Sequence, residues 1–342
     1  MNPKNLKYCP STLAEGFDTY SPSALRNMFF GKKVSHVLDF DAPDISEEVA
    51  EQFRQNSKTL SVSGAQFKQS LRLEKNKLRL TQPGESGQYI LKPIPIRPPF
   101  GKPEELPANE HLTMQIARQV YDIDTADCAL SFFKNGEPAY ITKRFDYNTE
   151  GEKIAQEDFA SLSGLAKEKD DNYKHRGSYE DIAKLMKRYL AAYVVEIEKY
   201  FKRVVFNYLF SNGDSHLKNF SLSQTPSSDY VLSPAYDMID TRIHIPPDSF
   251  FALSDGLFSG DYDTESFKVL GFYAYDDFYE FGIKIGMMES RVRKILDKYR
   301  TESKETNDLI QRSYLSTNVK ELFQSHYVDR IKMLNNSYRK RI

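Results

Sequence analysis

The sequence has little cysteine: Cys9 and Cys128 are the only two among 342 residues. Two cysteines cannot build the disulfide framework of a small secreted scaffold, and their separation matches no metal-binding spacing. The first residues, MNPKNLKYCPSTLAEGF, hold no apolar stretch of the length that a signal peptide needs. We therefore expect a cytoplasmic protein in a reducing environment.

Long apolar runs and an excess of one charge are also missing. No run reaches the roughly 18 apolar residues of a membrane-spanning helix, so we expect no membrane partner. Forty-seven basic residues stand against 48 acidic ones, for a net charge of -1. This balance argues against nucleic-acid binding through global charge, although a local basic patch remains open. With 40% hydrophobic and 28% charged residues, the composition is that of a globular protein.

The first half of the sequence predicts a small sheet. Residues 1–57 show no clear period beyond a short helix near Ser21. Leucines alternate through Leu71–Leu80 around Lys75-Asn76, which indicates a hairpin. An apolar strand runs over Tyr89–Pro95, and a second hairpin spans Cys128–Asp146 with its turn at Asn135-Gly136.

Helical patterns interrupt and then follow these strands. The stretch Ile96–Pro107 reads as a loop, and Ala108–Tyr121 as a helix with Asn109 as its cap. Apolar residues share one face over Ser178–Tyr193, including Tyr189, and again over Glu196–Phe210. Residues 276–342 are mostly helical in pattern.

This order of elements predicts an α+β fold with two lobes. The β-rich N-lobe covers residues 58–146 and the helical C-lobe residues 147–342, with a cleft between them. Residues 1–57 form an N-terminal segment of uncertain role.

The most informative stretch is NYLFSNGDSHLKNF, residues 207–220, where four polar side chains follow an apolar helix. Asp214, His216, Lys218 and Asn219 lie within six residues. A metal site, a phosphoryl-transfer loop and a polar Asn-Gly turn all fit this crowding. Zinc is the weaker metal, because His216 has no second histidine or cysteine at ligand spacing.

Phosphoryl transfer explains more of the pattern. In kinases an Asp orients the substrate hydroxyl and an Asn five residues later holds Mg²⁺. Asp214 and Asn219 have this spacing, and Asp237 follows Asn219 by 18 residues as a second metal-holding carboxylate. Mg²⁺ is satisfied by one or two such oxygen ligands together with phosphates.

A phosphate donor also needs a cation and an anion cradle. Lys92 stands in the apolar strand YILKPI, where a charge is costly without a partner. Glu110, at the start of the next helix, is the candidate partner. Gly64, in LSVSGAQFK, is only a weak indication of a phosphate-binding loop. The sequence has no GxxxxGK[ST] motif.

Seven pieces together resemble the HipA-type serine/threonine kinases, a family of bacterial toxins whose kinase fold is distantly related to phosphoinositide kinases. They are SVSGAQFK, YILKP, NEHLTMQIA, ITKRFD, AQEDFA, NGDSHLKNFSL and LSPAYDMIDT, in matching order and spacing. The resemblance covers roughly residues 57–342. Length and the short N-terminal segment look most like the compact branch, in which a separate small protein supplies the N-terminal subdomain.

The resemblance implies ATP and Mg²⁺ as cofactors and a role for each matching residue. Asp214 becomes the catalytic base and Asn219 and Asp237 the Mg²⁺ ligands. The residues expected to form the nucleotide-binding part of the site are Lys92, Gly64, Ala65, Phe145, His216 and Glu110. Ser61 and Ser63 match loop serines whose autophosphorylation inactivates such kinases by disordering the phosphate-binding loop.

The family also implies partners. These are an aminoacyl-tRNA synthetase as substrate, a helix-turn-helix antitoxin, a small protein like the HipA N-terminal subdomain, and DNA only through the antitoxin. One departure from the family pattern is Lys143, where many members have Glu before Arg-Phe-Asp. Adenine contacts at this hinge are mainly to the backbone, so nucleotide binding should survive.

Three other functions compete with a protein kinase toxin. A small-molecule phosphotransferase of the antibiotic-kinase kind shares the spaced Asp and Asn, but its loop usually begins His-Gly-Asp rather than Asn212-Gly213-Asp214. A secreted HipA-like effector kinase would need an export signal. A pseudokinase that only sequesters an antitoxin would have no need of catalytic and metal-binding residues. The presence of Lys92 together with Asp214, Asn219 and Asp237 therefore argues against it.

Overall fold

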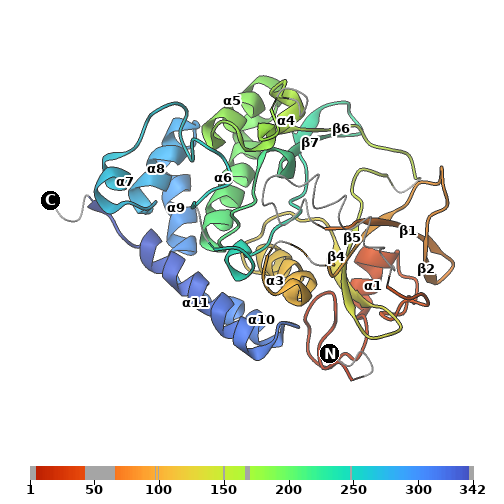
Figure 1. Ribbon diagram of the computed structural model, residues 1–342. Helices are drawn as coiled ribbons and strands as arrows, with labels where there is room; N and C mark the ends of the chain where they lie inside the picture. Colours follow the sequence, from red (N-terminus) through yellow and green to blue (C-terminus); the bar gives the residue numbers. More distant parts are fainter. Residues whose placement is uncertain are drawn as a thin grey trace.

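The computed structural model describes residues 5–42, 66–96, 98, 100–148, 151–165, 170–246 and 249–338. Its arrangement is the expected α+β one: a sheet lies on the right of Figure 1 and a body of helices on the left. The central sheet is antiparallel, with strand order β2-β1-β3-β5-β4. Its strands are β1 (Gln69–Glu74), β2 (Lys77–Leu80), β3 (Tyr89–Pro93), β4 (Cys128–Phe132) and β5 (Pro138–Lys143).

Both predicted hairpins are confirmed. β1 pairs with β2 across Lys75, whose φ of 53° lies in the left-handed region that closes the turn. β4 pairs with β5 across a turn in which Gly136 has a φ of 87°. Glycine takes this conformation without steric cost, which is why Asn135-Gly136 correctly predicted the position of the turn. Cys9 and Cys128 are both buried free thiols.

Helix α3 (Leu106–Gln119) covers one face of the sheet, and the prediction that Asn109 caps it was wrong. The helix begins at Leu106, two residues before the predicted start, because Pro107 fits its first turn, where no N–H is needed. A short 3₁₀ turn, η1 (Pro103–Glu105), leads into it, so the predicted loop also ends early. Asn109 is fully buried and bonds to a distant loop described below.

The described part of the N-terminal segment covers the other face of the sheet. Its helix α1 (Pro22–Phe29) starts where predicted, because the Ser21 side chain accepts a hydrogen bond from Ala24 N at 3.2 Å. Alternation along the strands separates two cores: Tyr89 and Leu91 of β3 pack against this segment, while residues facing the other way pack against α3. The segment is therefore part of the sheet's core.

The C-terminal part is helical, as predicted. Its longest helices are α6 (Tyr193–Leu209) and α11 (Thr317–Leu334). The predicted face of α5 (Tyr179–Tyr189) is wrong at Tyr189, which is 41% exposed, because the helix ends there and Leu190 turns to extended backbone. The remaining helices are α4 (Phe159–Leu162), α7 (Glu265–Leu270), α8 (Tyr275–Lys284), α9 (Glu289–Tyr299) and α10 (Lys304–Arg312).

A second, three-stranded sheet was not predicted. It has the order β6-β7-β8 and comprises β6 (Gln156–Asp158), β7 (Ser221–Gln224) and β8 (Tyr230–Leu232). Its strands have only three or four residues, too few to show a period. The loop that holds Asp214 connects α6 to β7, and the segment that holds Asp237 follows β8. This small sheet therefore brings the two predicted site segments side by side.

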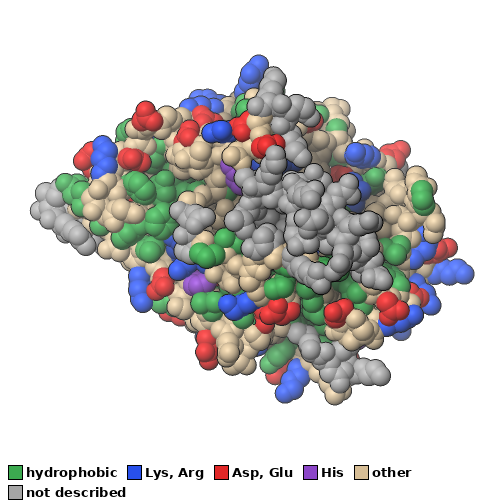
Figure 2. Space-filling model, in the orientation of Figure 1, with side chains coloured by type: hydrophobic (Ala, Val, Ile, Leu, Met, Phe, Trp, Pro, Cys, Tyr) green, Lys and Arg blue, Asp and Glu red, His purple; other side chains and the backbone are tan. Residues whose placement is uncertain are grey.

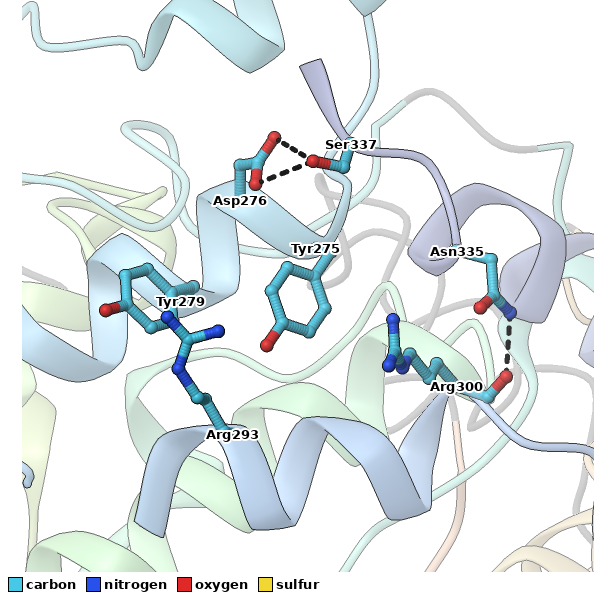
Figure 3. Close-up of a pocket in the computed structure, with 7 residues that line it drawn as sticks. All are labelled: Tyr275, Asp276, Tyr279, Arg293, Arg300, Asn335 and Ser337. Atoms are coloured by element: carbon cyan, nitrogen blue, oxygen red, sulfur yellow. Dashed lines mark hydrogen bonds between the residues drawn. The ribbon is translucent and has the colours of Figure 1, made fainter. Parts of the chain in front are cut away.

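The chain after α11 is fastened to α8 and α9 (Figure 3). Ser337 donates to the two carboxylate oxygens of Asp276 at 3.0 and 2.9 Å, and Asn335 Nδ2 donates to Arg300 O at 2.7 Å. These residues line a pocket of about 270 Å³. Its charged groups are paired within the chain, so we assign it a structural role.

The face of the molecule drawn in Figure 2 carries no dominant charge. Acidic and basic side chains alternate over the face drawn in Figure 2, in keeping with the net charge of -1. Among the described residues, no helix is long and apolar enough to cross a membrane.

We expect acid to destabilise the fold through His111. This α3 side chain is fully buried, and its Nε2–H donates to Ser11 O at 2.7 Å, which ties the N-terminal segment to α3. Burial lowers the pKa of His111 to about 4. Because the unfolded chain binds this proton near pH 6.5, stability falls as pH drops below that value, by roughly 2 kcal/mol at pH 5.

Urea unfolding at pH 7.5 and pH 5 measures this loss. His111→Gln is the matched variant, because the Gln amide can donate to Ser11 O and does not titrate. The difference between the two pH values should be smaller in the variant than in the wild type. Equal differences would show that His111 does not carry this pH dependence.

Candidate active site

The centre of the site is an ion-paired triad. Lys92 Nζ, on β3, lies 2.5 Å from Glu110 Oε1 and 2.6 Å from Asp237 Oδ1. Lys92 and Glu110 are each 2% exposed. The expected Lys92–Glu110 pair is present, and Asp237, 145 residues from Lys92 in sequence, completes it. One lysine thus connects β3, α3 and the segment after β8.

The triad holds an excess of negative charge. Burial lowers the pKa of Lys92, but Asp237 and Glu110 outweigh burial and raise it overall, so the lysine is charged. Burial, assisted by the charge of Asp237, raises the pKa of Glu110 to about 7 against the opposing effect of Lys92. Lys68 Nζ, 3.7 Å from Asp237 Oδ2, adds a second cation at the exposed side. With Lys68 included, two cations face the two carboxylates.

Asp237 sits on strained backbone. Its φ is 55°, in the left-handed region, which costs on the order of 1–3 kcal/mol for a residue other than glycine. Asn109 braces the segment that follows: its Nδ2 donates to Asp240 O at 2.9 Å, and its Oδ1 accepts from Asp240 N at 3.2 Å. Because Asn109 precedes Glu110 on α3, the same helix positions both carboxylates around Lys92.

The loop after α6 is shaped by its own backbone. Asn219 Nδ2 donates to Asp214 O at 3.1 Å, and His216 N donates to the same oxygen at 2.9 Å. Gly213 N donates to Thr241 Oγ1 at 2.9 Å, which joins this loop to the segment that carries Asp237. These bonds place Asp214 and Asn219 on one turn and link that turn to the triad.

His216 lies beside Asp214. Its Nε2 is 3.8 Å from Asp214 Oδ1, and its ring meets His175 edge to face at 5.2 Å between centroids. Burial, assisted by the positive charge of Lys174, lowers the pKa of His216 well below its usual value, against the opposing charge of Asp237. His216 is therefore neutral, and its buried Nδ1 has no hydrogen-bond partner within the described part of the chain.

One polar residue of the NGDSHLKN motif, Lys218, does not join the triad. Lys218 Nζ pairs with Asp158 Oδ2 at 2.5 Å and is partly exposed. Phe145 lies at the junction of the two parts and packs on Tyr236, with ring centroids 5.5 Å apart. Gly64, Ala65, Ser61 and Ser63 lie outside the described residues.

Lys174 was missed by the sequence analysis. It lies on the 3₁₀ turn η2 (Tyr173–His175), which packs against the Asp214 loop. Burial lowers its pKa, and the charge of Asp214 acts in the opposite direction. No periodicity marks this residue, and only the fold brings it near Asp214. Lys68, by contrast, lies in the stretch SVSGAQFK, which marks it as a cation near the phosphates.

The donor set fits Mg²⁺ better than zinc. No group of three or more His, Cys, Asp or Glu among the described residues is arranged to hold a metal ion. What the site offers is the Asp237 carboxylate and the Asn219 side-chain oxygen, whose amide nitrogen is turned to Asp214 O. Mg²⁺ takes one or two such oxygens and completes its octahedron with phosphates and water. The residues present therefore fit a nucleotide-bound Mg²⁺.

Comparison with known proteins decides the family. The model of the HipA-like C-terminal domain matches residues 60–306, more than half of the chain. The chain belongs to the HipA family. A protein of Haemophilus influenzae named putative kinase is 26% identical over 94% of both chains. Putative kinase Y4dM of Sinorhizobium fredii is 32% identical over 63% of this chain and 53% of its own length.

A solved structure gives the same fold. HipA of Shewanella oneidensis MR-1, solved in complex with HipB and operator DNA, superposes with a TM-score of 0.57. It is 20% identical, over 86% of this chain and 72% of that one. The HipA-like kinase fold predicted from the seven motifs is thus confirmed, and the chain is a kinase-like member of the family.

Proposed function

We propose that this HipA-family protein is an ATP-dependent protein serine/threonine kinase. The observation that carries the proposal is the triad, in which one buried lysine on β3 bonds a helix glutamate and the aspartate after β8. Protein kinases place a strand lysine, a helix glutamate and a metal-holding aspartate in this relation. Family membership and relatives named putative kinases support the same reading.

Each residue then has a distinct task. Lys92 binds the nucleotide phosphates, and Glu110 orients it. Asn219 and Asp237 hold Mg²⁺, which neutralises phosphate charge when bound. Asp214 accepts the proton of the substrate hydroxyl, and Phe145 marks the hinge that contacts adenine through its backbone. His216 is neutral and adds no positive charge beside Asp214, the carboxylate proposed as the base.

The proposed biological role is that of a toxin in a bacterial toxin–antitoxin system. The solved relative that binds HipB and operator DNA supports a helix-turn-helix antitoxin as partner, with DNA reached through it. An aminoacyl-tRNA synthetase is the proposed substrate. A small protein like the HipA N-terminal subdomain is the proposed second partner.

A labelling experiment tests the reaction class. The protein is incubated with Mg·ATP carrying a labelled γ-phosphate and a bacterial extract, and protein-bound and small-molecule label are counted separately. We expect label on serine or threonine of a protein, stable to acid. Label confined to small molecules would establish the alternative phosphotransferase, and transfer to neither would leave only a binding role.

We expect the active protein to phosphorylate itself at Ser61 or Ser63. Both serines flank Val62 in the segment proposed to cover the ATP phosphates. A phosphoserine adds about −1.5 to −2 charge at pH 7, which repels the triphosphate and opposes the closed segment. Intact mass after incubation with Mg·ATP should rise by one phosphate, mapping to residues 61–68.

Two controls sharpen this prediction. Asp214→Ala should remain unmodified, and Ser61→Asp with Ser63→Asp should lose activity, whereas Ser70→Asp on β1 adds the same charge outside the segment. An active enzyme that stays unmodified, or full activity in the Ser61 and Ser63 variants, would refute this form of regulation.

A further inference from the structure

A groove lies at the start of helix α6, away from the site just described. It has a volume of about 460 Å³. One wall is the first three turns of α6, and the other is the turn between α8 and α9. Its lining includes the apolar Val194, Val195 and Met288 and the charged Glu198, Lys202 and Arg291.

Three side chains that line this groove are apolar and open to water. Val194 is 78% exposed, Val195 60% and Met288 65%, the three highest values among the exposed large hydrophobic residues of the described chain. A single exposed apolar side chain is ordinary, but three in one concave site mark an interaction surface. Methionine adapts its shape to different partners, which suits a docking role.

The rim of the groove is basic. Lys199, Lys202 and Arg291 line it against a single lining acid, Glu198. Glu198 lies 3.3 Å from Lys202 Nζ and 3.9 Å from Arg291 Nε, so two cations share one carboxylate. Lys199 pairs with the buried Glu196 at 2.7 Å. Even with Glu196 included, cations outnumber acids by three to two.

The groove and the catalytic loop lie at opposite ends of one helix. α6 has 17 residues, which corresponds to about 25 Å. Val194 and Val195 stand in its first turn, whereas Asp214 follows its last. A segment confined to the groove would therefore leave Asp214 uncovered.

We propose that this groove docks an acidic amphipathic segment of a partner protein. Apolar side chains of the segment would cover Val194, Val195 and Met288, and its carboxylates would meet the three cations of the rim. The concave shape favours a peptide over a flat membrane surface, and the rim sets the sign of the partner's charge. This proposal does not depend on the proposed kinase reaction.

Selection from a displayed library of random 16-residue peptides tests the proposal. The full-length protein is the bait, and a Val195→Asp, Met288→Asp variant is the counter-bait. Both replaced side chains are mostly exposed, and Asp in the first turn of a helix is favourable, so the variant should keep the wild-type melting temperature. Val269→Asp, on α7, is the matched control at a residue 55% exposed.

We expect enriched peptides to combine carboxylates with apolar residues at helical spacing. By fluorescence anisotropy, their affinity should fall at least tenfold in the double variant and in Lys202→Glu, Arg291→Glu, and stay unchanged in Val269→Asp. Neutral or basic peptides, or equal enrichment by the double variant, would overturn the proposal. So would groove-dependent binding to phosphatidylglycerol vesicles, or groove-dependent self-association in sedimentation, without acidic peptides.

Discussion

Replacing Asp214 with alanine should lower phosphoryl transfer by about 10²–10⁴-fold, the usual effect of losing a general base. The loop should keep its shape, because its backbone oxygen, not its carboxylate, accepts the bonds from Asn219 and His216. Nucleotide affinity should also survive, since Lys92 lies on β3, outside this loop. The Asp214→Ala variant should therefore lose catalysis while it keeps nucleotide binding.

Single-turnover rates and nucleotide titration of the same samples measure the two effects. Asp214→Asn keeps the size of the side chain and should be as impaired as Asp214→Ala. Asp229→Ala, at an exposed turn between β7 and β8, is the control and should be fully active. An Asp214 variant that transfers phosphate at the wild-type rate would remove this residue from the mechanism.

Replacing Lys92 with methionine should damage both stability and nucleotide binding. The buried Glu110 and the partly buried Asp237 would then face each other without their shared cation. Breaking a buried ion pair by removing one partner typically costs about 3–5 kcal/mol. We expect the lower end of this range, because Glu110, whose pKa is already raised to about 7, can take up a proton.

The pH dependence of this variant has a definite sign. Without Lys92 the pKa of Glu110 in the folded protein rises further above its unfolded value of 4.5. A carboxyl group with a raised folded pKa is stabilising at low pH, and that stability is lost as pH rises through the folded pKa. Lys92→Met should therefore lose stability, relative to wild type, between pH 6 and pH 8.

Urea unfolding across this range makes the test. Lys92→Met combined with Glu110→Gln removes the titrating group and should recover stability at pH 8, but not nucleotide affinity. Lys77→Met, at an exposed position on β2, is the control. A Lys92 variant with wild-type stability and affinity at pH 8 would contradict the role of the triad.

The sequence was informative where the cause of a structure is local. Alternating leucines and an Asn-Gly turn specify hairpins, and a lysine between apolar strand residues requires a partner. The Lys92–Glu110 pair could therefore be predicted from neighbouring elements. Asp237 could be anticipated only by its order and spacing after Asn219.

The features that the sequence did not predict share a different cause. Asn109 looked like a helix cap, but its partner Asp240 lies 131 residues away in sequence, and a local pattern cannot reveal such a bond. The same holds for Lys174, and for the segment containing Ser21, which joins the core of the sheet only after folding. Strands of three or four residues, such as β7, are too short to carry a periodic signal.

One measurement tests the central claim directly: a crystal structure with Mn²⁺ and a non-hydrolysable ATP analogue, in which anomalous scattering locates the metal. Mn²⁺ takes the same oxygen ligands as Mg²⁺. We predict the ion within about 2.5 Å of both Asn219 Oδ1 and the Asp237 carboxylate, with Lys92 on the phosphates. An ion held elsewhere, or a nucleotide bound away from Lys92, would contradict the assignment of this site.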